Sequence, residues 1–488
     1  MKISAIFKTT ALCPLAILAG CAGVGSLSDS RKASDEIALA LARHAGHAKP
    51  AAESTAESSS ALNGGVQTLP QAELRTRASS RKKSSAPELP SLSGKLSLAD
   101  SVTLALANNH DIKSAYLAKR ASEGLIDQAY ADAMPNAALS ASAQNNFSAD
   151  DHNDNYGLGV RITQPLWRGG AVAAGLRYAK YYAASADFTI REMASDIVFA
   201  VSEKYLSVLL NQQLASVYEE AAAVSERLLQ TANSRRAQGV APEYEVLRAQ
   251  VEVANARADL INASNALRRA EITLFDTMGV SQESTVSFSG ALAYEPERFD
   301  EALIFELAAL NRPDLLKAQA AVFMARENLN VVKSDYRVKL DAFGNAGYNN
   351  NKQGDWDDEI IVGATASLQL YDGWKKRGKI AVAESQLAQS EVALRKAQDA
   401  ARVEAVNALL QLDYSEELYD SQKKNINVAR EALRMIEAGS RQGRNTQVEV
   451  LDARAAVTGA MGAYYRAIHS HTLAKLAIRE AAGMLSAE

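Results

Sequence analysis

The sequence predicts a mainly α-helical chain that contains one structural unit twice, each copy holding a helix, a β-hairpin, a long helix and a returning helix. First, Gln-Gly and Glu-Val-Leu-x-Ala recur at one spacing in residues 238–249 and 442–453. Second, the segments before them, residues 176–238 and 379–438, contain no Gly or Pro. Third, ahead of each long segment the apolar pattern changes from helical periodicity to alternation. A recurring order of this kind indicates a duplication.

Composition argues against nucleic acid as a partner but does not exclude a membrane protein. The 488 residues carry a formal net charge of -4, so no basic excess points to nucleic acid. Hydrophobic residues make up 47% but aromatic residues only 6%, which suits closely packed, alanine-rich helices. No run of 18 apolar residues follows the first twenty, so no membrane-spanning helix is expected. Strands of a membrane barrel would leave a weaker signal.

The N-terminus has the features of a targeting segment. Lys2 and Lys8 precede a short apolar stretch that ends in Leu18-Ala19-Gly20-Cys21, which resembles the lipobox of bacterial lipoproteins. Residues 1–21 are therefore expected to be a signal peptide and lipobox, with Cys21 acylated as the new N-terminus. Cys13 would be removed, which leaves no disulfide. An ordinary secretory signal with a chance cysteine is the alternative.

The remaining chain divides into four expected segments. Residues 22–94, rich in Ala, Ser and charge, are predicted to be a disordered tether. Residues 95–279 form the first repeat, residues 280–300 a linker, and residues 301–485 the second repeat. In both repeats the first helix is expected to break at a matching Asn-x-x-Asp, and Pro313 marks the second break.

The alternating segments predict membrane strands. Each spans about ten residues, the length of a tilted strand across a bilayer. Val160, Ile162, Val362 and Ala364 are expected to face lipid. Aromatic residues flank the strands and are expected at the membrane interface: Trp167, Trp356, Tyr371 and Trp374. A soluble hairpin with aromatic end packing is the alternative. Four strands cannot close and lipid does not tolerate open edges, so a dimer or trimer is required.

The long segments predict coiled-coil helices. Each strand pair should end in a turn, at residues 166–170 and 370–374, from which a long helix starts. Apolar residues then recur every seven positions, which is typical of coiled-coil packing. These positions are Leu176, Ala183, Ile190 and Ile197, and Ile380, Leu387, Leu394 and Ala401. An ordinary coiled coil would explain this period but not the lipobox or the paired hairpins.

Enzyme motifs are absent from the sequence, so no catalytic residue, metal or cofactor is expected. The chain has no Gly-rich phosphate loop, nucleophile elbow or Cys-x-x-Cys. His469 and His471 are two residues apart, so on a helix they point to different sides.

Three features together resemble the TolC-type outer-membrane channel family, over about residues 95 to 485. They are Gly443 followed by Val-Glu-Val-Leu-Asp from Val448, Gly239 followed by Glu-Val-Leu from Glu245, and the strand-to-helix turns at Leu166 and Leu370. The lipobox is similar to that of members with an N-terminal lipid. The resemblance implies a homotrimer with a 12-stranded barrel and a 12-helix periplasmic tunnel.

The resemblance also implies a function and its partners. We expect a passive exit duct of a tripartite efflux or type I secretion system, lipid-anchored in the outer membrane and extending into the periplasm. Its partners would be a periplasmic adaptor protein and an inner-membrane transporter. The competing reading is a structural or adhesive periplasmic coiled-coil lipoprotein without a pore.

The two Gly turns carry the expected sites. By resemblance, Glu449 and Asp452 match acidic residues of a periplasmic gate. Glu245 occupies the corresponding place in the first repeat. The alternative is that these acids only stabilise the start of a helix. Gln238, Gly239, Gln442 and Gly443 match the adaptor docking sites and should also be helix C-caps. The family pairs a Tyr and an Arg near the second turn with the first, but this chain has Ser440 and Asn445, so another contact must hold any closed state.

Overall fold

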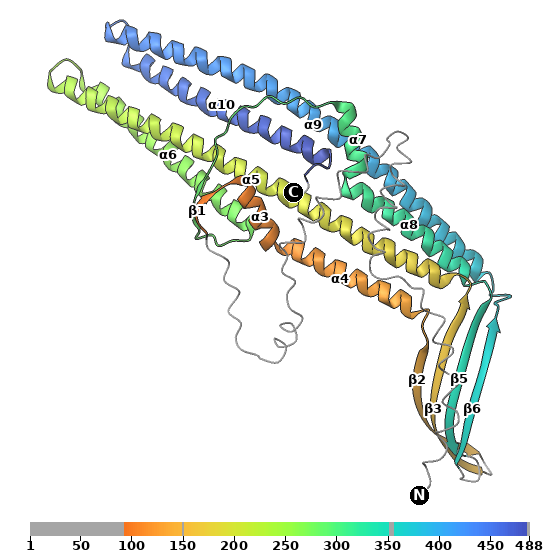
Figure 1. The fold of residues 1–488 in the computed structure, drawn as a ribbon. Helices are drawn as coiled ribbons and strands as arrows, with labels where there is room; N and C mark the ends of the chain where they lie inside the picture. The colour runs from red at the N-terminus through yellow and green to blue at the C-terminus, as the bar shows by residue number, and fades with distance from the viewer. Residues whose placement is uncertain (1–91, 149–150, 351–355, 486–488) are drawn as a thin grey trace. The chain divides into compact units, whose positions relative to one another are not determined.

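The computed structural model describes residues 92–148, 151–350 and 356–485 (Figure 1). The expected signal peptide, Cys21 and nearly all of the expected tether therefore lie outside the described residues. In the described part of the chain, no helix has the length and apolar character needed to cross a membrane.

The order of elements is the same in both halves, which confirms the predicted duplication. The first half contains β1 (Ser93–Leu96), α3 (Leu98–Asn108), α4 (His110–Ala131), β2 (Asn136–Ser148), β3 (Asp151–Arg168), α5 (Ala171–Ala237) and α6 (Glu243–Met278). The second contains β4 (Thr285–Phe288), α7 (Glu301–Asn311), α8 (Pro313–Ser334), β5 (Lys339–Asn350), β6 (Trp356–Ser367), α9 (Lys375–Arg441) and α10 (Gln447–Ala481). The expected helix breaks lie between α3 and α4 and between α7 and α8.

Two compact units make up the chain, and the first contains the large sheet. This unit includes Lys119–Asp187 and Ala318–Val392. Its four antiparallel strands lie in the order β2-β3-β5-β6, with β2 and β6 at the edges (Figure 1). The two hairpins, one from each repeat, thus join into a single sheet through β3 and β5.

The register places the alternating apolar residues on one face of the sheet. Leu139, Val160, Ala346 and Ile360 pair in one row across the four strands. Successive residues of a strand point to opposite faces, so Ile162, Val362 and Ala364 share this face. The predicted grouping of the four residues is confirmed; that this face contacts lipid stays a prediction.

The opposite face is more polar. In its central row Arg161 pairs with Asn345, and Asn345 pairs with Ile361. The side chains confirm the pairing, since Arg161 Nε donates to Asn345 Oδ1 over 2.9 Å. A sheet with one apolar and one polar face can separate lipid from water.

The strands are longer than the ten residues expected, and the first turn is shorter. β3 extends to Arg168, because Trp167 and Arg168 still pair with Leu340 and Lys339 after a bulge between Pro165 and Trp167. The expected turn 166–170 therefore reduces to Gly169 and Gly170. The second turn agrees better with the expectation, since β6 ends at Ser367 and α9 starts at Lys375.

The second unit includes Phe188–Lys317 and Ala393–Glu488, and it contains two small strands that the sequence did not predict. β1 and β4 pair in parallel, with Leu96 opposite Phe288. The expected tether therefore ends before Ser93, and the expected linker 280–300 is partly a strand. The pairing forms because Leu96 and Phe288 pack into a core with Tyr205 and Phe275.

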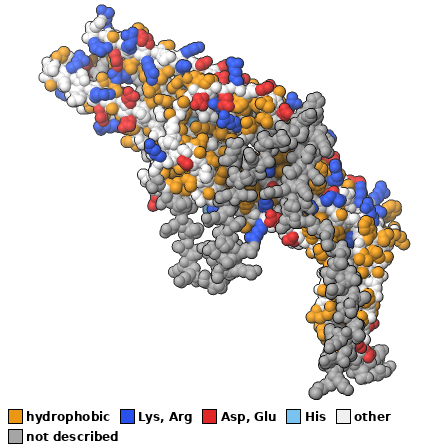
Figure 2. All heavy atoms as spheres, in the orientation of Figure 1, with side chains coloured by type: hydrophobic (Ala, Val, Ile, Leu, Met, Phe, Trp, Pro, Cys, Tyr) orange, Lys and Arg blue, Asp and Glu red, His pale blue; other side chains and the backbone are white. Residues whose placement is uncertain are grey.

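The seven-residue period of α9 corresponds to a narrow covered seam. The predicted positions Ile380, Leu387, Leu394 and Ala401 are all buried or half-buried, and the seam continues through Ala405, Ala408 and Leu412. Apolar residues outside the seam remain exposed: Val382, Val392, Val403, Leu410, Tyr414 and Val428. In Figure 2 hydrophobic side chains are visible between the charged ones over the helical segments.

Candidate functional site

The first helical hairpin turns at Gly239, in the second unit. Gly239 has a φ of 71°, where a side chain would be strained. Its N–H donates to Arg236 O, and Val240 N–H donates to Arg235 O, which together form a Schellman cap. Gln238 is the last residue before this glycine. The prediction that Gly239 is a helix C-cap is therefore confirmed.

The second hairpin turns at Gly443 in the same way. Its φ is 74°, its N–H donates to Ser440 O, and Arg444 N–H donates to Gly439 O. Gln442 occupies the position of Gln238. Gln442, Gly443 and Arg444 are all exposed, as are Gln238 and Gly239, so both turns present their backbone to solvent.

The acidic residues beside the turns differ in their surroundings. Glu449 and Asp452 lie one helical turn apart at the start of α10, and both are exposed. Glu449 completes a capping box, since its Oε2 accepts from Thr446 N–H over 3.1 Å. Glu245 is half-buried in the first hairpin, where its carboxylate lies 3.9 Å from Arg235 Nη1. The second hairpin thus has two exposed acids that form no ion pair within the described residues, and the first has one half-buried acid that lies close to an arginine.

Asn445 holds the second turn together. Its amide donates to Glu449 Oε2 over 2.8 Å. Its Oδ1 also lies against Gly439, where an added Cβ would come within 1.8 Å of that oxygen. Ser440 contributes the carbonyl that accepts from Gly443 N–H. Ser440 and Asn445, where the resemblance implies a Tyr and an Arg, thus make contacts within their own hairpin.

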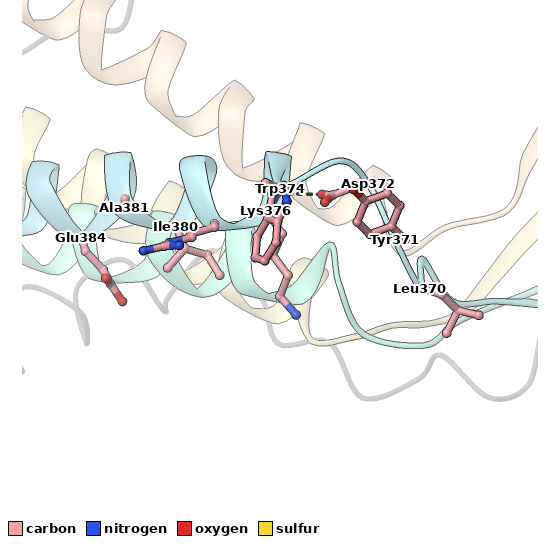
Figure 3. A pocket seen from close by; sticks show the side chains of 9 residues that line it. Leu370, Tyr371, Asp372, Trp374, Lys376, Ile380, Ala381 and Glu384 are labelled. Atoms are coloured by element: carbon pink, nitrogen blue, oxygen red, sulfur yellow. Dashed lines mark hydrogen bonds between the residues drawn. The ribbon is translucent and has the colours of Figure 1, made fainter.

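The structure describes the side chains of three of the four predicted interface aromatic residues, all in the first unit. Trp167 is in β3 and is 56% exposed. Tyr371 and Trp374 lie in the turn between β6 and α9 and are 75% and 70% exposed. Both line a hollow of about 560 Å³ at that turn. Figure 3 shows their side chains there. The side chain of Trp356 lies outside the described residues.

Sequence reasoning missed an aromatic cluster in the second unit. Tyr294, from the segment after β4, stacks on Tyr419 of α9 with ring centroids 3.7 Å apart and planes 7° apart. His471 of α10 is fully buried beside them, with Nε2 3.2 Å from Glu295 O and Nδ1 3.3 Å from Ser415 Oγ. His469 points to another side, as predicted, and burial lowers its pKa. The cluster fastens the inter-repeat segment to both helices.

A charged cluster in the same unit was also missed. Arg312, between α7 and α8, lies 2.8 Å from Glu404 of α9 and 2.9 Å from Asp314. Glu480 of α10 is near this group. Burial raises the pKa of Glu480 to about 7, and the carboxylates of Glu404 and Asp196 add to the effect. Arg312, Asp314, Glu404 and Glu480 belong to different elements of the second repeat, and Asp196 comes from α5 of the first, so the group is formed only when the chain folds.

Metal ligands do not gather in the described part of the chain. No group of three or more His, Cys, Asp or Glu residues there is arranged to hold a metal ion.

Comparison with known proteins identifies the family. The sequence model of the outer membrane efflux protein family matches the chain twice, over residues 102–280 and 304–484. The chain belongs to this family. The two matched segments correspond to the two repeats, so the sequence resemblance is confirmed for nearly all of the described residues. The family is one of channels, and this efflux protein is not an enzyme.

Individual relatives agree with this assignment. Outer membrane protein TolC of Vibrio cholerae is 27% identical over 354 residues, which cover 69% of the chain and 79% of that protein. Outer membrane efflux protein BepC of Brucella suis is 21% identical over 405 residues, 81% of the chain and 88% of that protein. The chain also superposes on the crystal structure of the Campylobacter jejuni CmeC outer membrane channel with a TM-score of 0.69 at 14% identity. The match covers 80% of the chain and 86% of that channel, so the two share a fold.

Proposed function

We propose that this efflux protein is the passive exit duct of a tripartite export system, a homotrimer whose strands form one 12-stranded barrel and whose helices form a 12-helix periplasmic tunnel. The observation that carries the proposal is a four-stranded sheet with one apolar face and two open edges, β2 and β6. Open edges are not tolerated in lipid, so copies of the chain must close the sheet.

The exposed residues of α9 support assembly from several copies. Outside its narrow seam, α9 leaves large apolar side chains in water, among them Val403, Leu410 and Tyr414. An exposed apolar stripe of this length is typical of a surface that another chain covers. The seven-residue seam of α9 is already covered within the chain, so these exposed residues form a second apolar surface against which a helix of another copy can pack.

The exposed acids suggest where the tunnel is gated. In a trimer, Glu449 and Asp452 would form anionic rings that favour cations. Glu245 would contribute less, because Arg235 lies close to its carboxylate. The exposed turns at Gln238-Gly239 and Gln442-Gly443 are suitable docking sites for a periplasmic adaptor, which would link the duct to an inner-membrane transporter. Whether that transporter belongs to an efflux pump or to type I secretion would be learned from the one that co-purifies.

Cys21 is the proposed lipid anchor, from the Leu-Ala-Gly-Cys motif. Mass spectrometry of the mature protein should find an acylated N-terminus at Cys21. An unmodified N-terminus at another residue would disprove the anchor while leaving the duct proposal intact, since the strands and not the lipid would span the membrane.

The duct is tested by assembly and conductance together. Outer-membrane fractions should contain an oligomer that resists heat and retains β-structure in detergent, and the purified oligomer should give discrete conductance steps in a planar bilayer. The alternative, a structural or adhesive periplasmic coiled-coil lipoprotein, predicts an oligomer without conductance. That result would reject the duct.

A further inference from the structure

A group of cations and aromatic side chains lies at the junction between β6 and α9, in the first unit. We call Trp374, Lys375, Lys376 and Arg377 the basic turn; all four side chains are exposed. Figure 3 shows Trp374 next to Lys376 at the start of α9, with Tyr371 and Leu370 leading up to them from the strand. Leu370 is 89% exposed. The chain therefore presents apolar rings and positive charge side by side in water.

The three cations of the basic turn are not neutralised by the described residues. Nearby lysines have acidic partners: Lys379 lies 3.8 Å from Asp335, and Lys333 lies 3.3 Å from Glu384. In the described part of the chain, no carboxylate forms an ion pair with the side chains of the basic turn. Lys376 Nζ lies 5.1 Å above the ring of Tyr336, a contact that leaves its charge in place.

The position of these cations is unfavourable for the isolated chain. They occupy the first turn of α9, which has no acidic residue there, and the helix dipole is positive at this end. The backbone itself is not open to a ligand, since Asp372 Oδ2 already accepts from Lys376 N–H over 2.7 Å. The Asp372 carboxylate offsets part of this repulsion, and an anion bound by the side chains would reduce it further.

The matching turn of the first repeat lacks these features. α5 starts at Ala171, and its first turn contains no charged residue. Arg168 is paired with Asp341 over 3.0 Å, and Arg337 donates to Gly169 O. The duplication therefore gives each chain one turn with free cations and one turn whose cations have partners within the chain.

We infer that the basic turn binds the phosphate of an anionic phospholipid at the membrane surface on the helical side of the strands. The inference rests on the proposed function, because it requires the strands to span a bilayer. Trp and Tyr concentrate at the level of the headgroups, and basic segments next to them are attracted by anionic lipid. Trp374 would lie among the headgroups, and Lys375, Lys376 and Arg377 would contact the phosphate.

The native tryptophan makes the inference testable. The chain has three tryptophans, so Trp167→Phe with Trp356→Phe leaves Trp374 as the only one. This protein is reconstituted in phosphatidylcholine vesicles that contain either dibrominated phosphatidylglycerol or dibrominated phosphatidylcholine. Quenching of Trp374 should show a preference for phosphatidylglycerol of about fivefold or more, the factor expected for one cation near an anionic surface. Lys375→Gln, Lys376→Gln and Arg377→Gln together should abolish the preference.

Controls separate the possible outcomes. Arg395→Gln, Lys396→Gln and Lys424→Gln remove three exposed cations elsewhere on α9 and should leave the preference unchanged. Equal quenching by both lipids, or a preference that survives the triple substitution in the basic turn, would overturn the inference. Quenching by neither lipid would also overturn the inference, because it would mean that another copy covers the turn. Displacement of the lipid by millimolar inorganic phosphate would overturn it as well. Conductance of the same sample tests the duct separately: discrete steps without a lipid preference reject only the lipid site.

Discussion

The side-chain amide of Asn445 lies 2.8 Å from Glu449 Oε2, so the carboxylate proposed for the gate is held by its own hairpin turn. The same oxygen accepts from Thr446 N–H. Glu449 therefore has a structural role in starting α10 as well as the proposed electrostatic one. Asp452, one turn later, has no part in this capping box. Substitutions at the two positions must be chosen so that the roles are separated.

Neutral variants that keep the cap should change ion selectivity without loosening the turn. Glu449→Gln retains an oxygen that can accept from Asn445 and Thr446, and Asp452→Asn removes a charge outside the cap. The double variant should weaken cation selectivity and block by divalent ions, because carboxylates brought together by symmetry attract cations. Single-channel recording in planar bilayers measures both.

Glu449→Ala is the companion variant. It loses the acceptor as well as the charge, so it should also cost about 1 kcal/mol of helix stability. If the neutral double variant kept the parent's selectivity and divalent block, the constriction would lie elsewhere, and the two acids would be ordinary helix-start residues.

A charge on the apolar face of the sheet should impair assembly. Val362→Arg places a cation where we expect lipid, at a cost of about 2–4 kcal/mol near the bilayer midplane. The yield of heat-resistant oligomer in outer membranes is the measurement. Ile361→Arg, one residue away on the opposite face, is the control and should reduce the yield much less. Equal yields of the parent and both variants would argue against a membrane barrel.

The fold was largely predictable because its signals are local. Apolar alternation fixed the strands, the seven-residue period fixed the seam of α9, and Gly239 and Gly443 marked the turns. The errors lie where distant residues decide. The sequence predicts a turn at Trp167 and Arg168, but pairing with Leu340 and Lys339 extends the strand. β4 is too short to show a pattern and exists through its pairing with β1.

The candidate site was predictable only in part, for the same reason. Exposed residues next to a glycine can be found by spacing, and the Asn445 position could be flagged as unusual. That its amide bonds to Glu449 depends on the geometry of the closed turn. The stack of Tyr294 on Tyr419 joins segments far apart in the chain, and single aromatic residues in an irregular segment carry no periodic signal.

Loss of the aromatic stack should free the inter-repeat segment. Tyr294→Ala removes the ring that packs on Tyr419, and we expect a loss of about 1–3 kcal/mol of stability. Hydrogen–deuterium exchange should rise in residues 289–300, while exchange in the β-sheet stays as in the parent. Tyr294→Phe keeps the ring and should behave like the parent. Unchanged exchange in Tyr294→Ala would mean that Lys475 and Arg479, which pair with Glu297, suffice to hold the segment.

The charged cluster around Arg312 should make stability depend on pH through Glu480. Burial and the carboxylates of Glu404 and Asp196 raise the pKa of Glu480 to about 7, above its ordinary value of 4.5. A raised pKa in the folded state means that folding favours the protonated acid. The stabilising contribution is therefore fully present below about pH 4.5 and is lost as the pH rises to about 7. Above pH 7 the folded chain holds an ionised carboxylate in unfavourable surroundings.

Glu480→Gln should therefore stabilise the oligomer at pH 8 and have little effect at pH 5. The side chain is partly exposed, so after allowance for solvent screening we expect a gain of about 1–2 kcal/mol at pH 8. Thermal unfolding in detergent, monitored by helical circular dichroism at both pH values, measures the difference. Glu417→Gln, an exposed acid on α9, should show no such pH dependence. If Glu480→Gln shifted the melting temperature equally at pH 5 and pH 8, the gain would come from packing of the amide and not from loss of the charge. In that case Arg312 would neutralise Glu480 more effectively than expected for an arginine already paired with Glu404 and Asp314.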